Sequence, residues 1–265
     1  MKTKKKKHTK IKVIAIVLVL CAAVCGAFFG YRATKQKSVN VKYQELAETA
    51  TDIKPEKEEE KEGILEELNI PVPDKNINWD MVKAENPDIY AWIYIPNTNV
   101  DYPVLQHPTD DEYYLNHNID GSEGYPGCIY SESVNKKDFS DPNTVLYGHD
   151  MNDGSMFSTL HNFEDNQFFN ENCYIYIYTP EKTFVYQIYS ASEFGDQHIM
   201  YAYDFQTEAG FNQFIADIGN SRDMASHKRD GIGMGYGRKL LTLSTCIATK
   251  PENRWLVTAV LMNEE

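Results

Sequence analysis

Cysteine is scarce in this chain of 265 residues, which has only five. Cys21 and Cys25 lie in an N-terminal apolar stretch, which leaves Cys128, Cys173 and Cys246 in the rest of the chain. An odd number leaves at least one thiol unpaired even in an oxidising compartment, so Cys128 and Cys173 either pair with each other or are buried free thiols. No two of these last three cysteines have the spacing of a zinc site. We therefore expect no metal and no cofactor.

Acidic residues are absent from the first 31 positions, which contain seven lysines, all before residue 13. The stretch from Val13 to Tyr31 is uncharged and mostly apolar, and it has about the 20 residues that a helix needs to cross a bilayer. The lysines belong on the cytoplasmic side, which places the rest of the chain outside the cell. A cleavable signal peptide is the alternative, but Phe28 and Phe29 continue the apolar run past its small residues. We predict a cytoplasmic basic tail (1–12) and a single-pass membrane anchor (13–31).

The remainder of the chain is strongly acidic. The whole chain has a net charge of −13, and because the first 31 residues contribute +7, the other residues carry −20. Such a surface is a poor partner for nucleic acid, and we expect none to bind. Residues 32–76 are rich in lysine and glutamate and lack tryptophan and phenylalanine, so they cannot bury enough apolar surface for a core. We predict that they form a charged extracellular tether, a stalk or a partly helical segment, and that a folded domain spans 77–265.

The compact region contains eight short runs with the alternating pattern of β-strands, separated by clusters of glycine, proline, asparagine and aspartate. They are Ile89–Ile95, Val100–Leu105, Cys128–Tyr130, Thr144–Tyr147, Tyr174–Tyr178, Thr183–Ser190, Lys239–Thr245 and Trp255–Met262. This pattern predicts a mostly β fold, either an all-β barrel or a sandwich, in a single domain without internal repeats.

Two helices are expected beside these strands. Asn78 is a candidate N-cap for a short helix that reaches Glu85, and Pro87 follows its end. Farther along, Phe211, Phe214, Ile215 and Ile218 fall on one face of a helix over Glu208–Ile218. This apolar face predicts that the second helix packs on the strands.

Three reactive side chains each lie at the edge of a predicted strand. Cys246 ends one run, His149 follows another, and Arg254 stands just before the last. A histidine imidazolium stabilises a thiolate and donates a proton to a leaving amine, and a guanidinium stabilises an oxyanion. Together these groups predict attack on an amide carbonyl, a thioester intermediate and release to a second nucleophile. Taken alone, a strand cysteine is more often a packing residue than a nucleophile.

Other polar residues offer alternatives to this assignment. Asp150 either orients His149 or caps the surface. The remaining histidines outside the anchor are expected to be surface or hydrogen-bonded polar residues: His107, His117, His161, His198 and His227.

Several segments resemble one family. The pentapeptide Thr242-Leu243-Ser244-Thr245-Cys246 resembles the TLxTC signature of sortases, the membrane-anchored transpeptidases of Gram-positive bacteria. The segment from Leu146 to Phe157 is similar to that around the catalytic histidine of class B sortases, and Ala91–Gln106 and Tyr113–His117 also resemble class B. The resemblance covers residues 78 to 262.

The resemblance implies a fold, a site and a reaction. The fold is an eight-stranded sortase β-barrel with an N-terminal helix and a helix between the sixth and seventh strands. Cys246 is the nucleophile, His149 the general acid/base and Arg254 the oxyanion donor, whereas Ser244 and Thr245 either line the substrate groove or merely continue the strand. The calcium site of class A sortases is not carried over.

The partners implied are surface proteins that bear a C-terminal sorting signal and an amine of a peptidoglycan precursor. The loop around Gln197–Asp204 and the helix after it are expected to set specificity. A pilin-polymerising sortase, a hydrolytic cysteine peptidase and a non-enzymatic surface scaffold are the alternatives. The sequence does not name the sorting motif or the accepting amine.

Overall fold

The N-terminal part of the chain is one long helix. The computed structural model describes residues 2–50, 65 and 70–263, and the chain divides into two units, Met1–Lys42 and Tyr43–Glu265. Helix α1 (Lys2–Ala50) forms the first unit and continues into the second. Among the described residues, one stretch of helix, Val17–Thr49, is long and apolar enough to cross a membrane, a test that a signal sequence also passes. Within the predicted tether, residues 32–50 are helical, and 51–64 and 66–69 lie outside the described residues.

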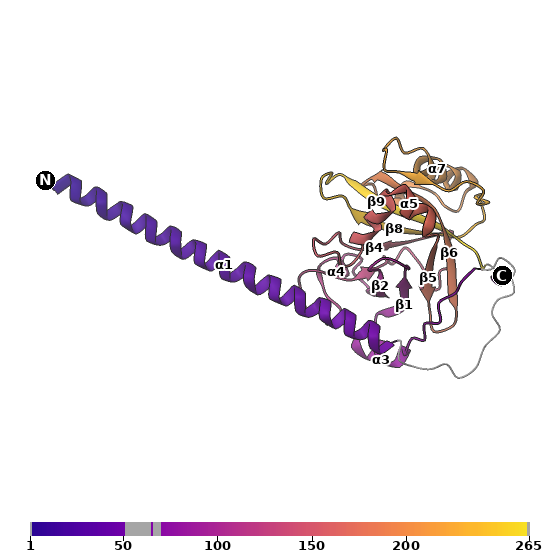
Figure 1. The fold of residues 1–265 in the computed structure, drawn as a ribbon, viewed down its shortest axis with the longest axis horizontal. Coiled ribbons are helices and arrows are strands. Elements are labelled where there is room, and N and C mark those ends of the chain that lie inside the picture. Colours follow the sequence, from indigo (N-terminus) through magenta and orange to yellow (C-terminus); the bar gives the residue numbers. More distant parts are fainter. Residues whose placement is uncertain (1, 51–64, 66–69, 264–265) are drawn as a thin grey trace. The chain divides into compact units, whose positions relative to one another are not determined.

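The second unit is built on a closed barrel of eight strands, as predicted (Figure 1). The order around the barrel is β5-β1-β2-β3-β4-β8-β9-β6, and pairing of β6 with β5 closes it. The strands are β1 (Ile89–Tyr94), β2 (Asp101–Leu105), β3 (Ile129–Tyr130), β4 (Asn143–Tyr147), β5 (Tyr174–Tyr178), β6 (Thr183–Gly195), β8 (Leu240–Cys246) and β9 (Asn253–Leu261). Most neighbours are antiparallel, but β2 pairs with β3, and β4 with β8, in parallel. Because both faces of a barrel strand are covered, the burial along these strands is nearly continuous.

Strand β6 is longer than its predicted span, which ended at Ser190. A register irregularity between Ile188 and Ser190 interrupts its pairing with β9, and the strand then continues to Gly195. A ninth, two-residue strand, β7 (His227–Lys228), pairs with this second half of β6. A bulge of this kind bends a strand without ending it, which explains why the strand runs past its predicted end.

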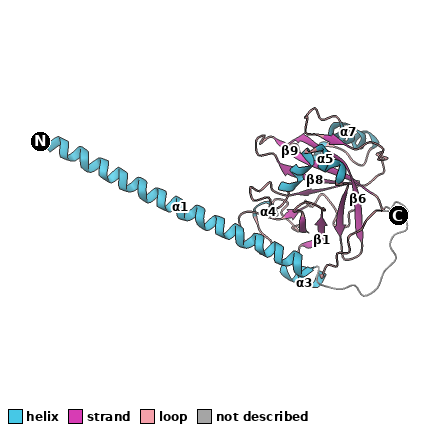
Figure 2. Cartoon of the chain, viewed as in Figure 1, coloured by secondary structure: helices cyan, strands magenta, loops and turns pink. Residues whose placement is uncertain are grey.

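Short helices precede β1 and lie in the connections between strands (Figure 2). In α3 (Trp79–Glu85), the Asn78 side chain accepts a hydrogen bond from the Met81 amide, as predicted for an N-cap. The others are α4 (Tyr113–Asn116), the 3₁₀ helix η1 (Ser158–Glu164), α5 (Asn166–Glu171), α6 (Ile199–Ala202) and α7 (Glu208–Gly219). The predicted helix between the sixth and seventh strands is therefore present as α7.

Helix α7 packs on the barrel through the face that its sequence predicts. Thr207 caps its first turn, and Phe211, Phe214 and Ile218 are buried in a cluster with side chains of β4, β8 and β9. Full burial of one such side chain contributes roughly 1.5–3 kcal/mol. This packing holds α7 on the barrel, chiefly against β6, and in one cluster with side chains of β4 and β8, whose far ends carry the candidate site.

The compact unit begins before residue 77. Tyr43 and Leu46 near the end of α1 are buried, and the Tyr43 hydroxyl donates to the Gly127 carbonyl over 2.8 Å. Farther along, the Tyr178 hydroxyl donates to the Pro73 carbonyl, and Lys75 forms an ion pair of 2.8 Å with Asp101. The structural unit thus extends to residues before 77. The sequence does not indicate this because the few residues that contact the barrel lie in a highly charged stretch.

Candidate active site

The parallel pairing of β4 and β8 brings two of the predicted residues to one edge of the barrel. Tyr147 on β4 pairs with Ser244 on β8, and the Gly148 amide donates to the Ser244 carbonyl over 3.2 Å. His149 and Cys246 each lie two residues beyond this pair, in the same direction. Because parallel strands end on the same side, the imidazole and the thiol emerge at a common edge.

Arg254 reaches this edge from the opposite direction along β9. In the antiparallel register of β8 and β9, Cys246 pairs directly with Arg254. Side chains opposite each other in such a pair have Cβ atoms about 4.5–5.5 Å apart. Arginine Nη1 donates to the carbonyls of Pro251 and Asn253, each over 2.9 Å, which holds the guanidinium beside its own loop.

The loop that joins Cys246 to Arg254 is tied to β6. Lys250 forms ion pairs with Glu193 and with Asp223, the second at 3.3 Å. Asn253 donates to the other oxygen of the Glu193 carboxylate over 2.6 Å. These contacts limit the freedom of the loop, and with it the position of Arg254.

The candidate nucleophile is the one exposed residue of its strand. The six preceding residues of β8 are buried, and Cys246 is exposed. Cys128 and Cys173 are also free thiols in the structure and do not pair with each other. Of the two predicted alternatives, the buried free thiol therefore applies to Cys128. Burial raises the pKa of the Cys128 thiol to about 12, whereas Cys173 is half-buried. A thiol kept protonated in this way is a poor nucleophile.

His149 is oriented by backbone rather than by Asp150. Its Nε2 lies 2.8 Å from the Leu115 carbonyl oxygen, and its ring contacts Tyr125 edge-on at a centroid distance of 5.0 Å. A carbonyl oxygen only accepts, so Nε2 carries the hydrogen and Nδ1 is the nitrogen that exchanges a proton. The Asp150 carboxylate instead lies 3.8 Å from Nε2 of His161.

The residue before His149 has no room for a side chain. A Cβ atom on Gly148 would lie 2.5 Å from Ile129 Cδ1 and 2.8 Å from the ring of Phe157, both of which are buried. Real Cβ atoms do not approach so closely. Glycine therefore permits the turn that carries His149 off the end of β4.

The predicted substrate-binding residues are inside the barrel wall. Ser244 and Thr245 are 6% and 2% exposed, and their strand partners are Leu256 and Trp255. The Thr245 hydroxyl has no hydrogen-bond partner among the described residues. Their part in substrate binding stays a prediction.

The predicted specificity segment contains α6. Tyr201 on this helix is 71% exposed, and the neighbouring His198 forms an ion pair of 2.5 Å with Glu132. The Tyr203 hydroxyl donates to Asp217 of α7 over 2.7 Å, which links the segment to the helix after it.

One residue near the nucleophile was not singled out by its sequence. Nε2 of His161 lies 2.9 Å from the carbonyl oxygen of Cys246, so the residue is a hydrogen-bonded histidine as expected, but its partner is the candidate nucleophile. It lies on η1, 85 residues before its partner. No sequence pattern marks such a contact, because it depends on how η1 folds against β8 and β9.

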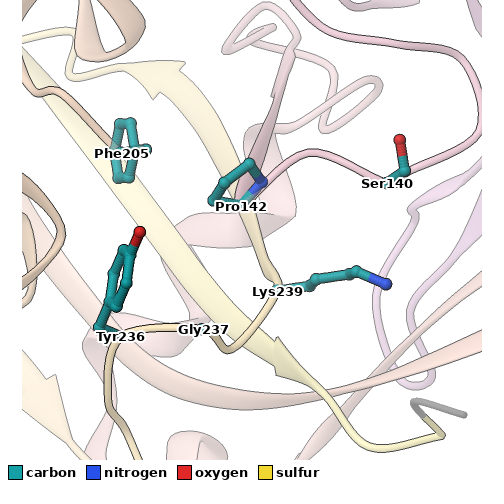
Figure 3. Close-up of a pocket in the computed structure, with 6 residues that line it drawn as sticks. All are labelled: Ser140, Pro142, Phe205, Tyr236, Gly237 and Lys239. Carbon is teal, nitrogen blue, oxygen red and sulfur yellow. The ribbon is translucent and has the colours of Figure 1, made fainter. Parts of the chain in front are cut away.

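A pocket elsewhere in the unit is separate from this site. Figure 3 shows it, and it has a volume of about 160 Å³ and is lined by Ser140, Pro142, Phe205, Tyr236, Gly237 and Lys239. Pro142 and Lys239 immediately precede β4 and β8, whereas His149 and Cys246 follow these strands. The pocket therefore lies at the opposite end of the two strands from the reactive side chains.

Comparison with known proteins decides the family. A family model described as the sortase domain matches residues 93–262 of the chain. The chain belongs to the sortase family. Sortase B of Listeria monocytogenes is 28% identical over 165 residues, which are 62% of this chain and 65% of that protein. The match thus spans slightly less than two thirds of that relative.

Solved structures agree with the class and with the fold of this sortase. The X-ray structure of Clostridium perfringens sortase B is 30% identical, with a TM-score of 0.61, and the match covers 69% of this chain and 98% of that chain. The crystal structure of sortase B from Bacillus anthracis is 25% identical, with a TM-score of 0.68, and covers 87% and 100%. The resemblance to class B sortases and the predicted barrel are both confirmed.

Proposed function

We propose that this sortase is a cysteine transpeptidase that cleaves the C-terminal sorting signal of surface proteins and transfers the acyl group to an amine of a peptidoglycan precursor. The observation that carries the proposal is the strand register, which gathers an exposed thiol, an imidazole and a guanidinium at one edge of the barrel. Family membership supports the same chemistry.

The first half of the reaction forms a thioester. The Cys246 thiolate attacks the scissile carbonyl carbon, and a C–S bond forms as the carbonyl π-electrons move to oxygen. Arg254 donates hydrogen bonds to this oxyanion, which lowers the barrier because the charge develops in the transition state. His149 donates a proton from Nδ1 to the departing amine as the C–N bond breaks.

The second half regenerates the enzyme. The accepting amine attacks the thioester carbonyl and gives its proton to Nδ1 of His149. The C–S bond then breaks, which leaves a new amide and returns the Cys246 thiolate and the His149 imidazolium. Hydrolysis follows the same steps with water, so the accepting nucleophile alone distinguishes the transpeptidase from the hydrolytic peptidase alternative.

Substitution at the three residues tests the proposal. We expect Cys246→Ala and His149→Ala to abolish cleavage of a sorting-signal peptide by the full chain in detergent, and Arg254→Lys to leave a small residual rate because lysine lacks the planar fork of donors. The measurement is the rate of peptide cleavage, together with mass spectrometry of the Cys246 adduct formed from a library of pentapeptide signals.

Cys173→Ala and His107→Ala are the matched controls and should retain the wild-type rate. Full turnover by Cys246→Ala would refute the mechanism.

We also propose that residues 13–31 of α1 are retained as a membrane anchor, with the lysines on the cytoplasmic side and the catalytic unit outside. The long apolar run in α1 supports the anchor, and the lysine-rich N-terminus supports the orientation. Intact mass spectrometry of the protein from a membrane fraction should give a chain that retains residues 2–31. A mature chain that starts after Ala23 or Ala27 would instead establish a cleaved signal peptide.

A further inference from the structure

His161 joins η1 to the backbone of the candidate nucleophile. Its Nδ1 lies 2.5 Å from Oε1 of Glu164, and its Nε2 lies 2.9 Å from the carbonyl oxygen of Cys246. The ring stacks on Trp255 of β9, with centroids 6.0 Å apart and planes at 27°. The side chain is 22% exposed, so water has restricted access to it. Both ring nitrogens therefore face a fixed oxygen atom of the protein.

These two partners select one protonation state. A carboxylate oxygen and a carbonyl oxygen only accept hydrogen bonds, so each contact needs an N–H on the ring. A neutral imidazole has one N–H, and its other nitrogen would direct a lone pair at an oxygen. The imidazolium has two and satisfies both partners. The geometry therefore favours the cationic ring.

The charges around the ring favour the same state. Glu164 faces it from η1, Asp150 faces it from the segment after β4 with Oδ2 3.8 Å from Nε2, and Cys246 faces it from the end of β8. The side chain that covers it from β9 is the uncharged Trp255. Two carboxylates near one imidazole stabilise its protonated form.

We propose that His161 is a positioning residue that holds a protonated imidazole on the Cys246 carbonyl, fixing the backbone of the nucleophile and placing a positive charge beside its thiolate. The inference rests on the proposed role of Cys246. The carbonyl oxygen and Sγ belong to one residue, so the cation lies within a Debye length, about 8 Å, of the sulfur. Glu164 orients the ring through Nδ1, and loss of its charge weakens the preference for the imidazolium.

The pH dependence of alkylation separates the charge from a merely structural role. His161→Gln keeps an amide donor for the Cys246 carbonyl but removes the charge. We expect the midpoint of the pH–rate profile for iodoacetamide alkylation of Cys246 to rise by about 1 pH unit, which slows the reaction up to about tenfold below the midpoint. Mass spectrometry of the peptide that contains Cys246 gives the rate in the full chain. An unchanged midpoint overturns the proposal.

A nearby histidine provides the matched control. Nε2 of His227 lies 2.9 Å from the Glu164 carbonyl oxygen, so His227→Gln disturbs η1 without touching Cys246. We expect this variant to retain the wild-type alkylation midpoint. If both variants shift it equally, loosening of η1 explains the effect and the proposal is wrong.

The protonation state is also measurable in the unmutated chain. The ¹³C and ¹⁵N chemical shifts of His161 should report an imidazolium at pH 7, and Glu164→Gln should lower the pH at which the ring loses its proton. A neutral ring at pH 7 contradicts the proposal, even if His161→Gln fails to fold. Neither readout needs a peptide substrate, so failure of transpeptidation and failure of this inference are distinguishable.

Discussion

A difference in burial makes two cysteine thiols of this chain differ in reactivity. Cys128 is 1% exposed, and its sulfur lies 3.2 Å from the oxygen of the buried Tyr43 hydroxyl. Loss of solvation is the main cause that raises the pKa of this thiol to about 12. Cys246 ends its strand in solvent. The same functional group is thus inert inside the barrel wall and accessible at its edge.

This contrast predicts selective alkylation. At pH 8, about one Cys128 in ten thousand is a thiolate, because the pH lies four units below the pKa of the group. We expect iodoacetamide to modify Cys246 in the native chain and to leave Cys128 unmodified until the protein unfolds. Peptide mapping with and without denaturant measures both sites. Comparable native-state rates at the two cysteines would show that burial does not control their reactivity.

At the scale of the element, the turn after β4 has the tightest steric requirement of the site. Gly148 is enclosed by Ile129 and Phe157, so a methyl group there forces these side chains or the turn that carries His149 to shift. A displacement of about 1 Å in a catalytic group can cost on the order of 10²-fold in rate. We therefore expect Gly148→Ala to lower the rate of peptide cleavage by ten- to a hundredfold, an order-of-magnitude estimate.

A second glycine serves as the control for this prediction. A Cβ on Gly233 would have nothing within 4 Å, so Gly233→Ala should retain the wild-type rate. Circular dichroism of both variants checks that each is folded. A folded Gly148→Ala protein with wild-type turnover would show that the turn tolerates the methyl group without moving His149.

Local patterns predict much of this architecture, and long-range contacts account for the rest. The eight barrel strands and α7 follow from apolar periodicity, which acts within a few residues. Strand β7 has two residues, too few to show an alternation of period two. The contact of His161 with Cys246 spans 85 residues and depends on how η1 packs against the barrel. The burial of Tyr43 likewise depends on partners far along the chain.

At the scale of the whole molecule, buried thiol and phenol groups with raised pKa values make the stability of the fold sensitive to alkaline pH. Burial raises the pKa of Cys128 from 9.0 to about 12 and that of the Tyr176 hydroxyl from 10.0 to about 12. Between pH 9 and 12 the unfolded chain releases these protons while the folded chain keeps them. The unfolded state then binds fewer protons, so the free energy of unfolding falls as pH rises.

Urea unfolding measured from pH 8 to 11 tests this dependence. Stability should be highest below pH 9 and should decline above it. Cys128→Ala removes one of the groups responsible, so its stability should decline less steeply with pH, whatever its value at pH 8. Cys173→Ala, at a half-buried position, should keep the wild-type slope. A Cys128→Ala profile parallel to the wild type over the whole range would exclude this thiol as a cause.

The parallel pairing of β4 and β8 also bears on how such a protein changes over time. Two adjacent parallel strands cannot be joined by a tight turn, so the chain makes a long excursion between them. From Gly148 to Lys239 it builds η1, α5, β5, β6, α6, α7 and β7 before it returns. Many of these elements can lengthen, shorten or exchange side chains while the ends of β4 and β8 stay in register. Apart from His149 and η1 with its His161, the excursion is therefore where a lineage can acquire new selectivity without rebuilding its chemistry.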